Sequence, residues 1–334
     1  LNPVSSDTEV QEALGLSTEA LENDRVQATA VSALRTAMLD AQARREGVSL
    51  AEFLGAEKPA GGFPAVRLYG NINRSMLPHD SGPVDRSPHA FAETAAGAVA
   101  AGFDTVKCAP FDECRAPFGG KGLPDEAREG LSRIAAARDA VGPTVTLLVD
   151  CHRRFDIESA LALEEELASL GVAWYEEPIN AAEDPEGMRR IRDAASIPVA
   201  GAEGDYGARR FADFIEEGIL DIVMPDVKFC GGAGEAAATG SRVEKFRPGS
   251  ISMHSPAGPP SMLASAHATL AFAGRNESSI LPVEHAWNEV TWRASVLEPA
   301  EDISQGALKV PGGPGLGAVL NPACIEARGR RWTP

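Results

Sequence analysis

The sequence has little positive charge for its length. Its 334 residues hold 31 Lys and Arg against 48 Asp and Glu, giving a net charge of -17. Because such a surface repels polyanions, we expect neither nucleic acid nor an anionic membrane as a partner. The sequence also contains no run of 18 apolar residues and no charged-then-apolar leader. We therefore expect a cytoplasmic protein without a membrane span.

Cysteine is scarce and scattered, and its odd count argues against a disulfide framework. No Cys-x-x-Cys pair occurs, so a zinc ribbon or a dithiol redox motif is excluded, and reduced thiols are expected. The five cysteines are Cys108, Cys114, Cys151, Cys230 and Cys324. The hydrophobic content of 44% is sufficient for one large core, with or without a small appended domain.

Helical patterns dominate the first part of the chain and then alternate with short apolar runs. Residues 19–45 predict one alanine-rich helix that ends at Gly47, and residues 157–170 predict an amphipathic helix that ends at Gly171. After a Pro- and Gly-rich break, eight runs predict strands. They are residues 65–70, 104–109, 146–151, 173–177, 197–203, 220–226, 250–254 and 279–284.

Eight apolar strands that alternate with helices indicate a parallel sheet, and about 220 residues suit a closed barrel. A doubly wound open sheet is the alternative. It is weaker because no Gly-x-Gly-x-x-Gly follows the first strand. In a closed barrel, polar residues at the carboxyl ends of the strands are placed for chemistry.

Such residues close most of the expected strands: Lys107, Asp150, His152, Glu176, Glu177, Glu203, Asp226, His254 and Glu284. Asp150, Glu176 and Glu203 are spaced by about one strand-helix unit each, so neighbouring strands bring three carboxylates to one rim. Three converging oxygen ligands indicate a divalent cation, and Mg²⁺ suits them best. One such acid alone is as readily a solvated loop residue, and His152 alone is as readily a core histidine. Glu177 is interpreted as a supporting or surface acid.

The segments VDCH (149–152), WYEEP (174–178), AGAE (200–203) and VMPDVKFCGG (223–232) together resemble the mandelate racemase group of the enolase superfamily. The resemblance extends to ALRTAMLDAQARREG before the barrel and to PGLG at 314–317. It implies an α/β fold, a (β/α)7β TIM-like barrel with a partial α+β capping domain whose N-terminal strands are missing. The implied divisions are a capping remnant with leading helices (1–60), the barrel (61–295) and a C-terminal segment returning to the capping domain (296–334).

By this resemblance, Asp150, Glu176 and Glu203 bind Mg²⁺, and His254 paired with Asp226 removes a proton next to a substrate carboxylate. Glu284 and Lys107 contact that carboxylate. Sites of the enolase superfamily are a standard example of a histidine or lysine base that works together with Mg²⁺ to stabilise an enediolate.

One departure from the family pattern narrows the reaction. Ala109 stands where the second lysine of a Lys-x-Lys motif is expected, so two-base racemisation is disfavoured. Asp226 occupies the position of a lysine in cycloisomerases that use paired lysines, which disfavours those enzymes too. His152 instead resembles the general acid of galactonate-type sugar acid dehydratases.

The favoured activity is therefore dehydration of a hydroxy carboxylate. The favoured substrate is an acid sugar, and its product is a 2-keto-3-deoxy acid. The same chemistry on a hydroxyproline-type substrate and a catalytically silent barrel that binds Mg²⁺ and a carboxylate stay open. Residues 109–122 either line the pocket or form a solvated loop, with Asp112, Glu113, Arg115 and Lys121 as their charged members. The resemblance also implies a homo-oligomer, a dimer or an octamer.

Overall fold

The computed structural model describes residues 7–76, 85–118, 122–274 and 280–329. Its N-terminal part is helical: α1 (Asp7–Leu14), α2 (Thr18–Asn23), α3 (Arg25–Glu46) and α4 (Leu50–Phe53). The single helix predicted over 19–45 is wrong, because Asp24 interrupts it. The Asp24 carboxylate accepts hydrogen bonds from the backbone N–H groups of Val26 and Gln27 and so begins a new helix. Gly47 ends α3 with φ 73°, as predicted.

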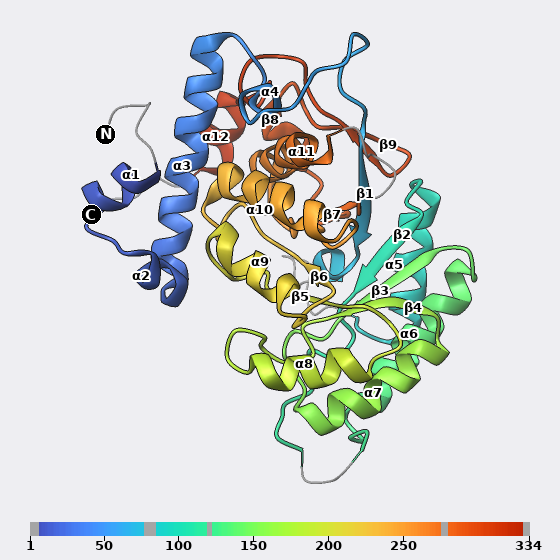
Figure 1. The fold of residues 1–334 in the computed structure, drawn as a ribbon. Coiled ribbons are helices and arrows are strands. Elements are labelled where there is room, and N and C mark those ends of the chain that lie inside the picture. The colour runs from blue at the N-terminus through green and yellow to red at the C-terminus, as the bar shows by residue number, and fades with distance from the viewer. Residues whose placement is uncertain (1–6, 77–84, 119–121, 275–279, 330–334) are drawn as a thin grey trace.

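The centre is a parallel barrel surrounded by helices (Figure 1). Its strands are β1 (Val66–Asn71), β2 (Thr105–Cys108), β3 (Thr146–Asp150), β4 (Val172–Glu176), β5 (Val199–Gly201), β6 (Ile222–Val223) and β7 (Val283–Ala286). Their helices are α5 (Pro88–Ala100), α6 (Ala127–Val141), α7 (Ile157–Ser169), α8 (Pro185–Ala194), α9 (Ala208–Glu216), α10 (Gly232–Phe246) and α11 (Pro259–Ala273). Neighbouring strands pair in chain order from β1 to β6, and β7 pairs with β1.

The predicted strand at 250–254 is not a regular strand. It is joined to β6 by a bridge between Val223 and Ile251 and by a hydrogen bond from Ser252 N to Val223 O (3.1 Å). On its other side Glu284 N donates to Met253 O (3.0 Å). These bonds close the ring, so the barrel is confirmed and the doubly wound alternative is wrong. The last predicted strand begins at Val283, and residue 279 of that prediction lies outside the described residues.

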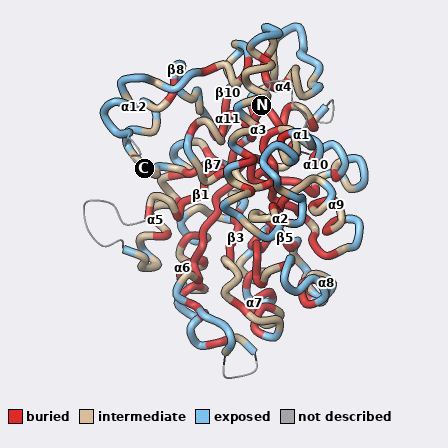
Figure 2. Tube along the Cα trace, turned by 90° about the vertical axis from the view of Figure 1, so that its left-hand side faces the viewer, coloured by how far each residue is buried: buried red, intermediate tan, exposed pale blue. Residues whose placement is uncertain are grey.

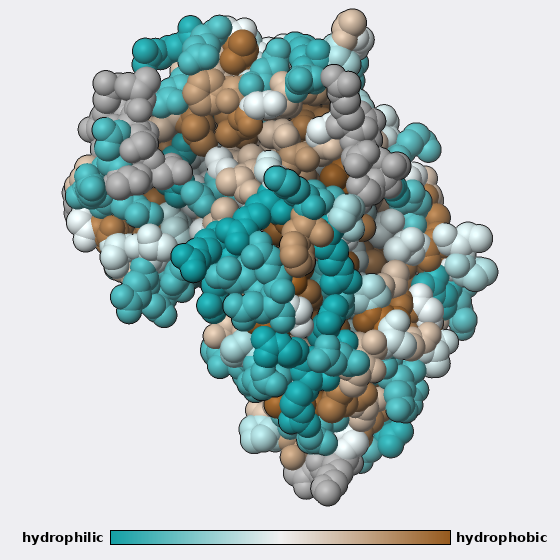
Figure 3. Space-filling view, in the orientation of Figure 1, coloured by the Kyte–Doolittle hydropathy of each residue, from teal (hydrophilic) through white to brown (hydrophobic). Residues whose placement is uncertain are grey.

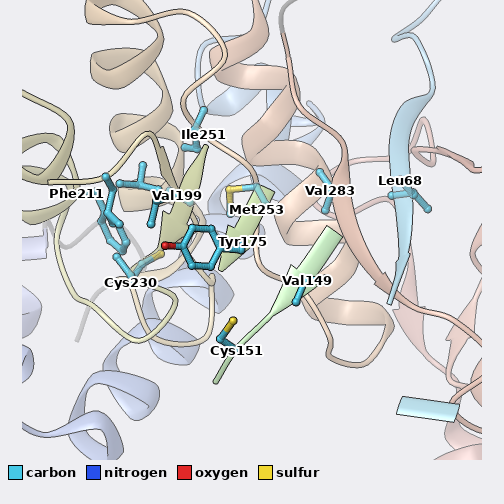
Figure 4. Packing of buried hydrophobic residues seen from close by; sticks show 14 of the residues in the cluster. Leu68, Val149, Cys151, Tyr175, Val199, Phe211, Cys230, Ile251, Met253 and Val283 are labelled. Atoms are coloured by element: carbon cyan, nitrogen blue, oxygen red, sulfur yellow. The ribbon is translucent and has the colours of Figure 1, made fainter. Parts of the chain in front are cut away.

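Residue alternation along the strands separates two cores. Leu148, Trp174 and Ala200 face the barrel interior in a small cluster. Their neighbours Val149, Tyr175 and Val199 belong to the large cluster that packs against the helices, and Figure 4 shows Tyr175 directed at Phe211 and Cys230. Because successive strand side chains point to opposite faces, the residues two positions after Leu148 and Trp174 also face inward. Those residues are Asp150 and Glu176.

The C-terminal segment returns to the N-terminal helices. It consists of η3 (Arg293–Ser295), β8 (Leu297–Glu298), β9 (Asp302–Ser304), β10 (Ala307–Lys309), β11 (Val319–Leu320) and α12 (Pro322–Arg328), while η1 (Asn73–Met76) follows β1. Leu316 N donates to Asp40 Oδ1 (2.6 Å), and the Arg44 guanidinium donates to Ala318 O (2.7 Å). In Figure 1, α12 at the red end of the chain lies beside α3, whereas β9 lies on the side of β1, with which β10 pairs.

Burial follows the barrel. Figure 2 shows buried residues along β1, β3 and β5, with exposed residues mainly on outer helices and loops. Hydrophilic side chains gather over α8 in Figure 3, where the helix carries Arg189, Arg190 and Glu186. Within the described ranges, no helix has the length and apolar character needed to cross a membrane.

Candidate active site

The carboxyl ends of the barrel strands bring the predicted site residues together at one rim. Four of these side chains are fully buried, and Asp150 and His254 are only 2% and 7% exposed. The fully buried residues are Lys107, Glu176, Asp226 and Glu284. Inward-facing charges at this depth require partners, since an unpaired buried charge is very costly.

Lys107, from β2, joins the carboxylates in the middle of the rim. Its Nζ lies 2.8 Å from Glu176 Oε1, 3.0 Å from Glu284 Oε1 and 3.6 Å from Asp150 Oδ2. Burial lowers the pKa of Lys107, but the charges of Glu176 and Glu284 outweigh it and hold the pKa well above its ordinary value. The side chain is therefore a buried ammonium group shared by three acids.

Glu176 and Glu203 form the core of a candidate metal site. One ligand atom from each, together with a nitrogen of His254, lie within 4.8 Å of one another. The third predicted ligand, Asp150, instead has an oxygen 3.1 Å from His152 Nε2. The structure thus groups Glu176 and Glu203 with His254, whereas the ligand set predicted from the sequence is completed by Asp150.

The electrostatics of these acids fit a divalent cation. Burial, followed by the charge of Asp150, raises the pKa of Glu176 well above its ordinary value. For Asp150, burial is outweighed by His152 and Lys107, which lower its pKa to about 2. Clustered, buried carboxylate oxygens suit the hard-oxygen coordination of Mg²⁺.

His254 is held by a buried aspartate. Its Nδ1 lies 2.8 Å from Asp226 Oδ2, while its Nε2 faces the mouth, 2.8 Å from Glu203 Oε2 and 3.5 Å from Glu284 Oε2. Burial lowers the pKa of His254, but Glu203 and Glu284 raise it further, so the net shift is well above its ordinary value. Asp226 is itself fixed by the N–H of Lys228 (2.8 Å).

His152 also lies at the rim and also has an aspartate on Nδ1. The partner is Asp112, from the loop after β2, at 2.6 Å. The charge of Asp150 is the largest cause that raises the pKa of His152 to about 11, against burial and with the help of the Asp112 hydrogen bond. The interpretation of His152 as an ordinary core histidine does not hold, because its side chain is 37% exposed.

The backbone after three successive strands is strained. His152, Arg153, Glu177 and Ala202 have φ values of 46°, 59°, 44° and 72°, in the left-handed region that favours glycine. Such residues cluster at functional sites, where the surrounding structure holds them in place. This observation marks the ends of β3, β4 and β5 without reference to any motif.

Sequence reasoning missed two features of the rim. Asn71, which ends β1, donates from Nδ2 to Glu284 Oε1 (2.5 Å), and its polar position after an apolar strand could have revealed it. Glu177 is not a surface acid: it is 4% exposed and forms a two-bond ion pair with Arg153, both bonds 2.6 Å long. Nothing in the sequence signalled that pairing.

The charged residues of the loop 109–122 contact different parts of the molecule. Asp112 reaches the rim, whereas Glu113 pairs with Arg86 (2.9 Å) and Arg133 (2.7 Å) away from it. The Arg115 guanidinium donates to backbone carbonyls of its own loop, at Asp112 and Cys114. Lys121 lies outside the described residues.

The barrel carries acids, a buried lysine and two histidines, each paired with an aspartate, at the carboxyl ends of its strands. This arrangement defines an enolase-type enzyme scaffold. Residues 90–324 match the family model described as Enolase C-terminal domain-like, and the chain belongs to that family. A solved member of the enolase superfamily from Salmonella Typhimurium has the same fold, with a TM-score of 0.82 and 24% identity, covering 98% of this chain and 82% of that one.

Two curated relatives match most of this chain but are themselves longer proteins. The D-gluconate dehydratase of Thermoproteus tenax is 29% identical over 307 residues, which cover 90% of this chain and 56% of that protein. The D-galactarolactone cycloisomerase of Agrobacterium fabrum is also 29% identical, over 302 residues that cover 88% of this chain and 72% of that protein. The chain thus spans little more than half the length of the first of these relatives.

Proposed function

We propose that the protein is a Mg²⁺-dependent hydro-lyase that removes the α-proton of a hydroxy carboxylate and expels the β-hydroxyl group. The favoured substrate is an acid sugar, and the product is a 2-keto-3-deoxy acid. The observation that carries this proposal is the placement of two histidines on opposite sides of the barrel mouth, each held at Nδ1 by an aspartate.

The opposition follows from the order of the ring. Between β3, which carries His152 at its end, and the segment that carries His254 lie β4, β5 and β6 on one side and β2, β1 and β7 on the other. A substrate between them meets one imidazole on each side. His254, with Nδ1 fixed by Asp226, accepts the α-proton at Nε2 in its neutral form, and His152, in its protonated form, donates a proton to the departing hydroxyl from Nε2.

The residues between the histidines divide into two groups. Glu176 and Glu203 on one side, with Asp150, are the proposed ligands of Mg²⁺. When bound, Mg²⁺ supplies Lewis-acid stabilisation of the negative charge that develops on the substrate carboxylate. Lys107, on the other side, donates a hydrogen bond to the same carboxylate and orients it. Glu284, which Asn71 holds in place, donates a hydrogen bond to it only in its protonated form.

Relatives support the substrate class. Curated proteins with 28% identity over 209 residues include the D-galactonate dehydratase of Xanthomonas oryzae pv. oryzae, besides the D-gluconate dehydratase above. The acidic composition of the chain also disfavours nucleic acid as the partner. A dimer or octamer is part of the proposal only by family resemblance.

A second candidate is isomerisation of an acid-sugar lactone. It is favoured by the cycloisomerase relative, of which the chain covers 72%. It begins with the same proton removal by His254 and needs no second lysine at Ala109. The two candidates differ in the leaving oxygen, a free hydroxyl in one and a ring oxygen in the other.

The test is a screen of the protein with Mg²⁺ against acid sugars, their lactones and hydroxyproline derivatives, with semicarbazide detection of 2-keto acids. The His254→Asn variant serves as the control for a contaminating activity. We expect a 2-keto acid from an acid sugar with the wild type and none with the variant. Confirmed Mg²⁺ binding with no product and no α-proton exchange from any of these acids contradicts the proposal and favours the silent barrel.

A further inference from the structure

His152 is held by a residue that does not belong to the barrel strands. Asp112 Oδ1 lies 2.6 Å from His152 Nδ1, although the two residues are 40 positions apart. The other side-chain nitrogen, Nε2, faces Asp150 Oδ2 at 3.1 Å, on the inner side of the rim. The imidazole is thus oriented with Nδ1 toward the loop and Nε2 toward the mouth.

Asp112 has a fixed position because the loop around it is anchored on both sides. Phe111 and Cys114 are each 1% exposed, and the Phe111 ring packs edge-on against Phe155, with centroids 5.2 Å apart. The fit is tight, since a Cβ added at Gly130 would collide with the Phe111 ring. Asp112 therefore projects from a short segment that is anchored by the buried residues Phe111 before it and Cys114 after it.

Two arginines hold the same segment from outside the barrel. Arg133 donates to Pro110 O (2.8 Å) and to Glu113 Oε2 (2.7 Å). Arg86 donates to Ala109 O (2.9 Å), and its guanidinium lies 3.5 Å from Asp112 Oδ2. The two oxygens of Asp112 are thereby distinguished: Oδ2 faces Arg86 and Oδ1 faces the imidazole.

From this geometry we propose that Asp112 is a positioning residue for His152, which sets the tautomer and the ring orientation that direct Nε2 at the leaving group. The inference rests on the proposed function, because it assigns His152 an action on the substrate. A hydrogen bond at one imidazole nitrogen decides which tautomer the other nitrogen presents. Asp112 and Asp226 then serve the two histidines in parallel, one from a loop and one from a strand end.

The first arm of the test is kinetic. Asp112→Asn keeps the shape but removes the charge, and Asp112→Ala removes the acceptor. We expect kcat for water loss to fall about 10- to 100-fold, by analogy with the loss of a partner that orients a metal-binding histidine. KM and the rate of α-proton exchange in D₂O should stay within about threefold, since binding and proton removal do not use Asp112.

Asp125→Asn is the matched control, because it makes the same change in the same β2–α6 connection. Asp125 is 88% exposed in its side chain and pairs only with the neighbouring Arg128 among the described contacts. It should behave as the wild type. Equal loss of exchange and water loss in Asp112→Asn, or no loss of either, overturns the inference.

The second arm needs no substrate and separates this inference from the proposed function. In ¹H–¹⁵N spectra of the six histidines, His152 is assigned with a His152→Gln variant. We expect its Nδ1 proton signal to move or vanish in both Asp112 variants and to persist in Asp125→Asn. If the screen finds no substrate and this signal still responds, only the proposed function fails. An unchanged signal refutes the positioning role itself.

Discussion

His254 and His152 each meet an aspartate through Nδ1, but the two pairs are built from different parts of the molecule. Asp226 is fully buried just after β6, and the His254 side chain is 9% exposed. Asp112 belongs to a loop, and both it and His152 are about one-third exposed, at 34% and 37%. The proposed base is therefore part of the barrel framework, whereas the proposed acid depends on a loop outside it.

The position of His254 is therefore fixed by the barrel, whereas the position of His152 also depends on a loop. A side chain at the end of a barrel strand has little freedom, because its strand is hydrogen bonded to a neighbouring strand on each side. A loop residue is placed by its own anchors, here Phe111 and Cys114. Changes in the loop should therefore alter the elimination step, while proton removal stays with the barrel.

The largest expected effect lies on the barrel side of the comparison. His254→Asn removes the base while keeping much of the shape of the side chain. We expect kcat to fall by roughly 10⁴-fold, at the upper end of the contribution of general acid–base catalysis, and α-proton exchange to stop. Kinetics and exchange in D₂O check this, and retained exchange would assign the proton removal to another group.

Mg²⁺ affinity distinguishes the two donor sets at the same rim. We expect Asp150→Asn to weaken Mg²⁺ binding about tenfold or more, because it removes a charged oxygen ligand. His254→Asn should change the affinity by less than about threefold, since a base is not a ligand. Calorimetry on both variants measures this. The reverse order would place the ion on Glu176, Glu203 and His254 instead.

The smallest expected effect comes from loosening the loop. Phe111→Leu removes part of a buried ring that packs against Phe155 and α6, and it should cost about 1 kcal/mol of folding stability. Water loss should slow by a few-fold, while α-proton exchange keeps its rate. Denaturant unfolding and the two rates check this, with Phe118→Leu, in the same aromatic cluster but farther along the chain from Asp112, as the control.

Most of the framework was predictable because it obeys local periodicity. The strand runs and the polar residues that close them define the barrel, and alternation explains why Asp150 and Glu176 face inward beside Leu148 and Trp174. The helix break at Asp24 was missed because the apolar residues on both sides of it continue one helical pattern, although Asp24 is the N-cap of α3. The segment 250–254 has the composition of a strand but keeps only a bridge and a few hydrogen bonds.

The remaining features depend on contacts between distant segments. The contact of Asp112 with His152 requires the loop anchors and two arginines from other parts of the chain. The spacing of residues in the sequence does not predict these contacts. The direction taken by Asp150, toward His152 and Lys107, results from the balance of charges at the rim. Composition and motif could locate these residues but not their partners.

The most direct test of the two-histidine account is His152→Gln, followed by two rates on one substrate in D₂O. The account predicts that α-proton exchange continues near the wild-type rate while water loss falls by about 10² to 10⁴-fold, because only the acid has been removed. If both rates fall together, His152 is not a separate acid, and the division of work between the barrel base and the loop-held acid is contradicted.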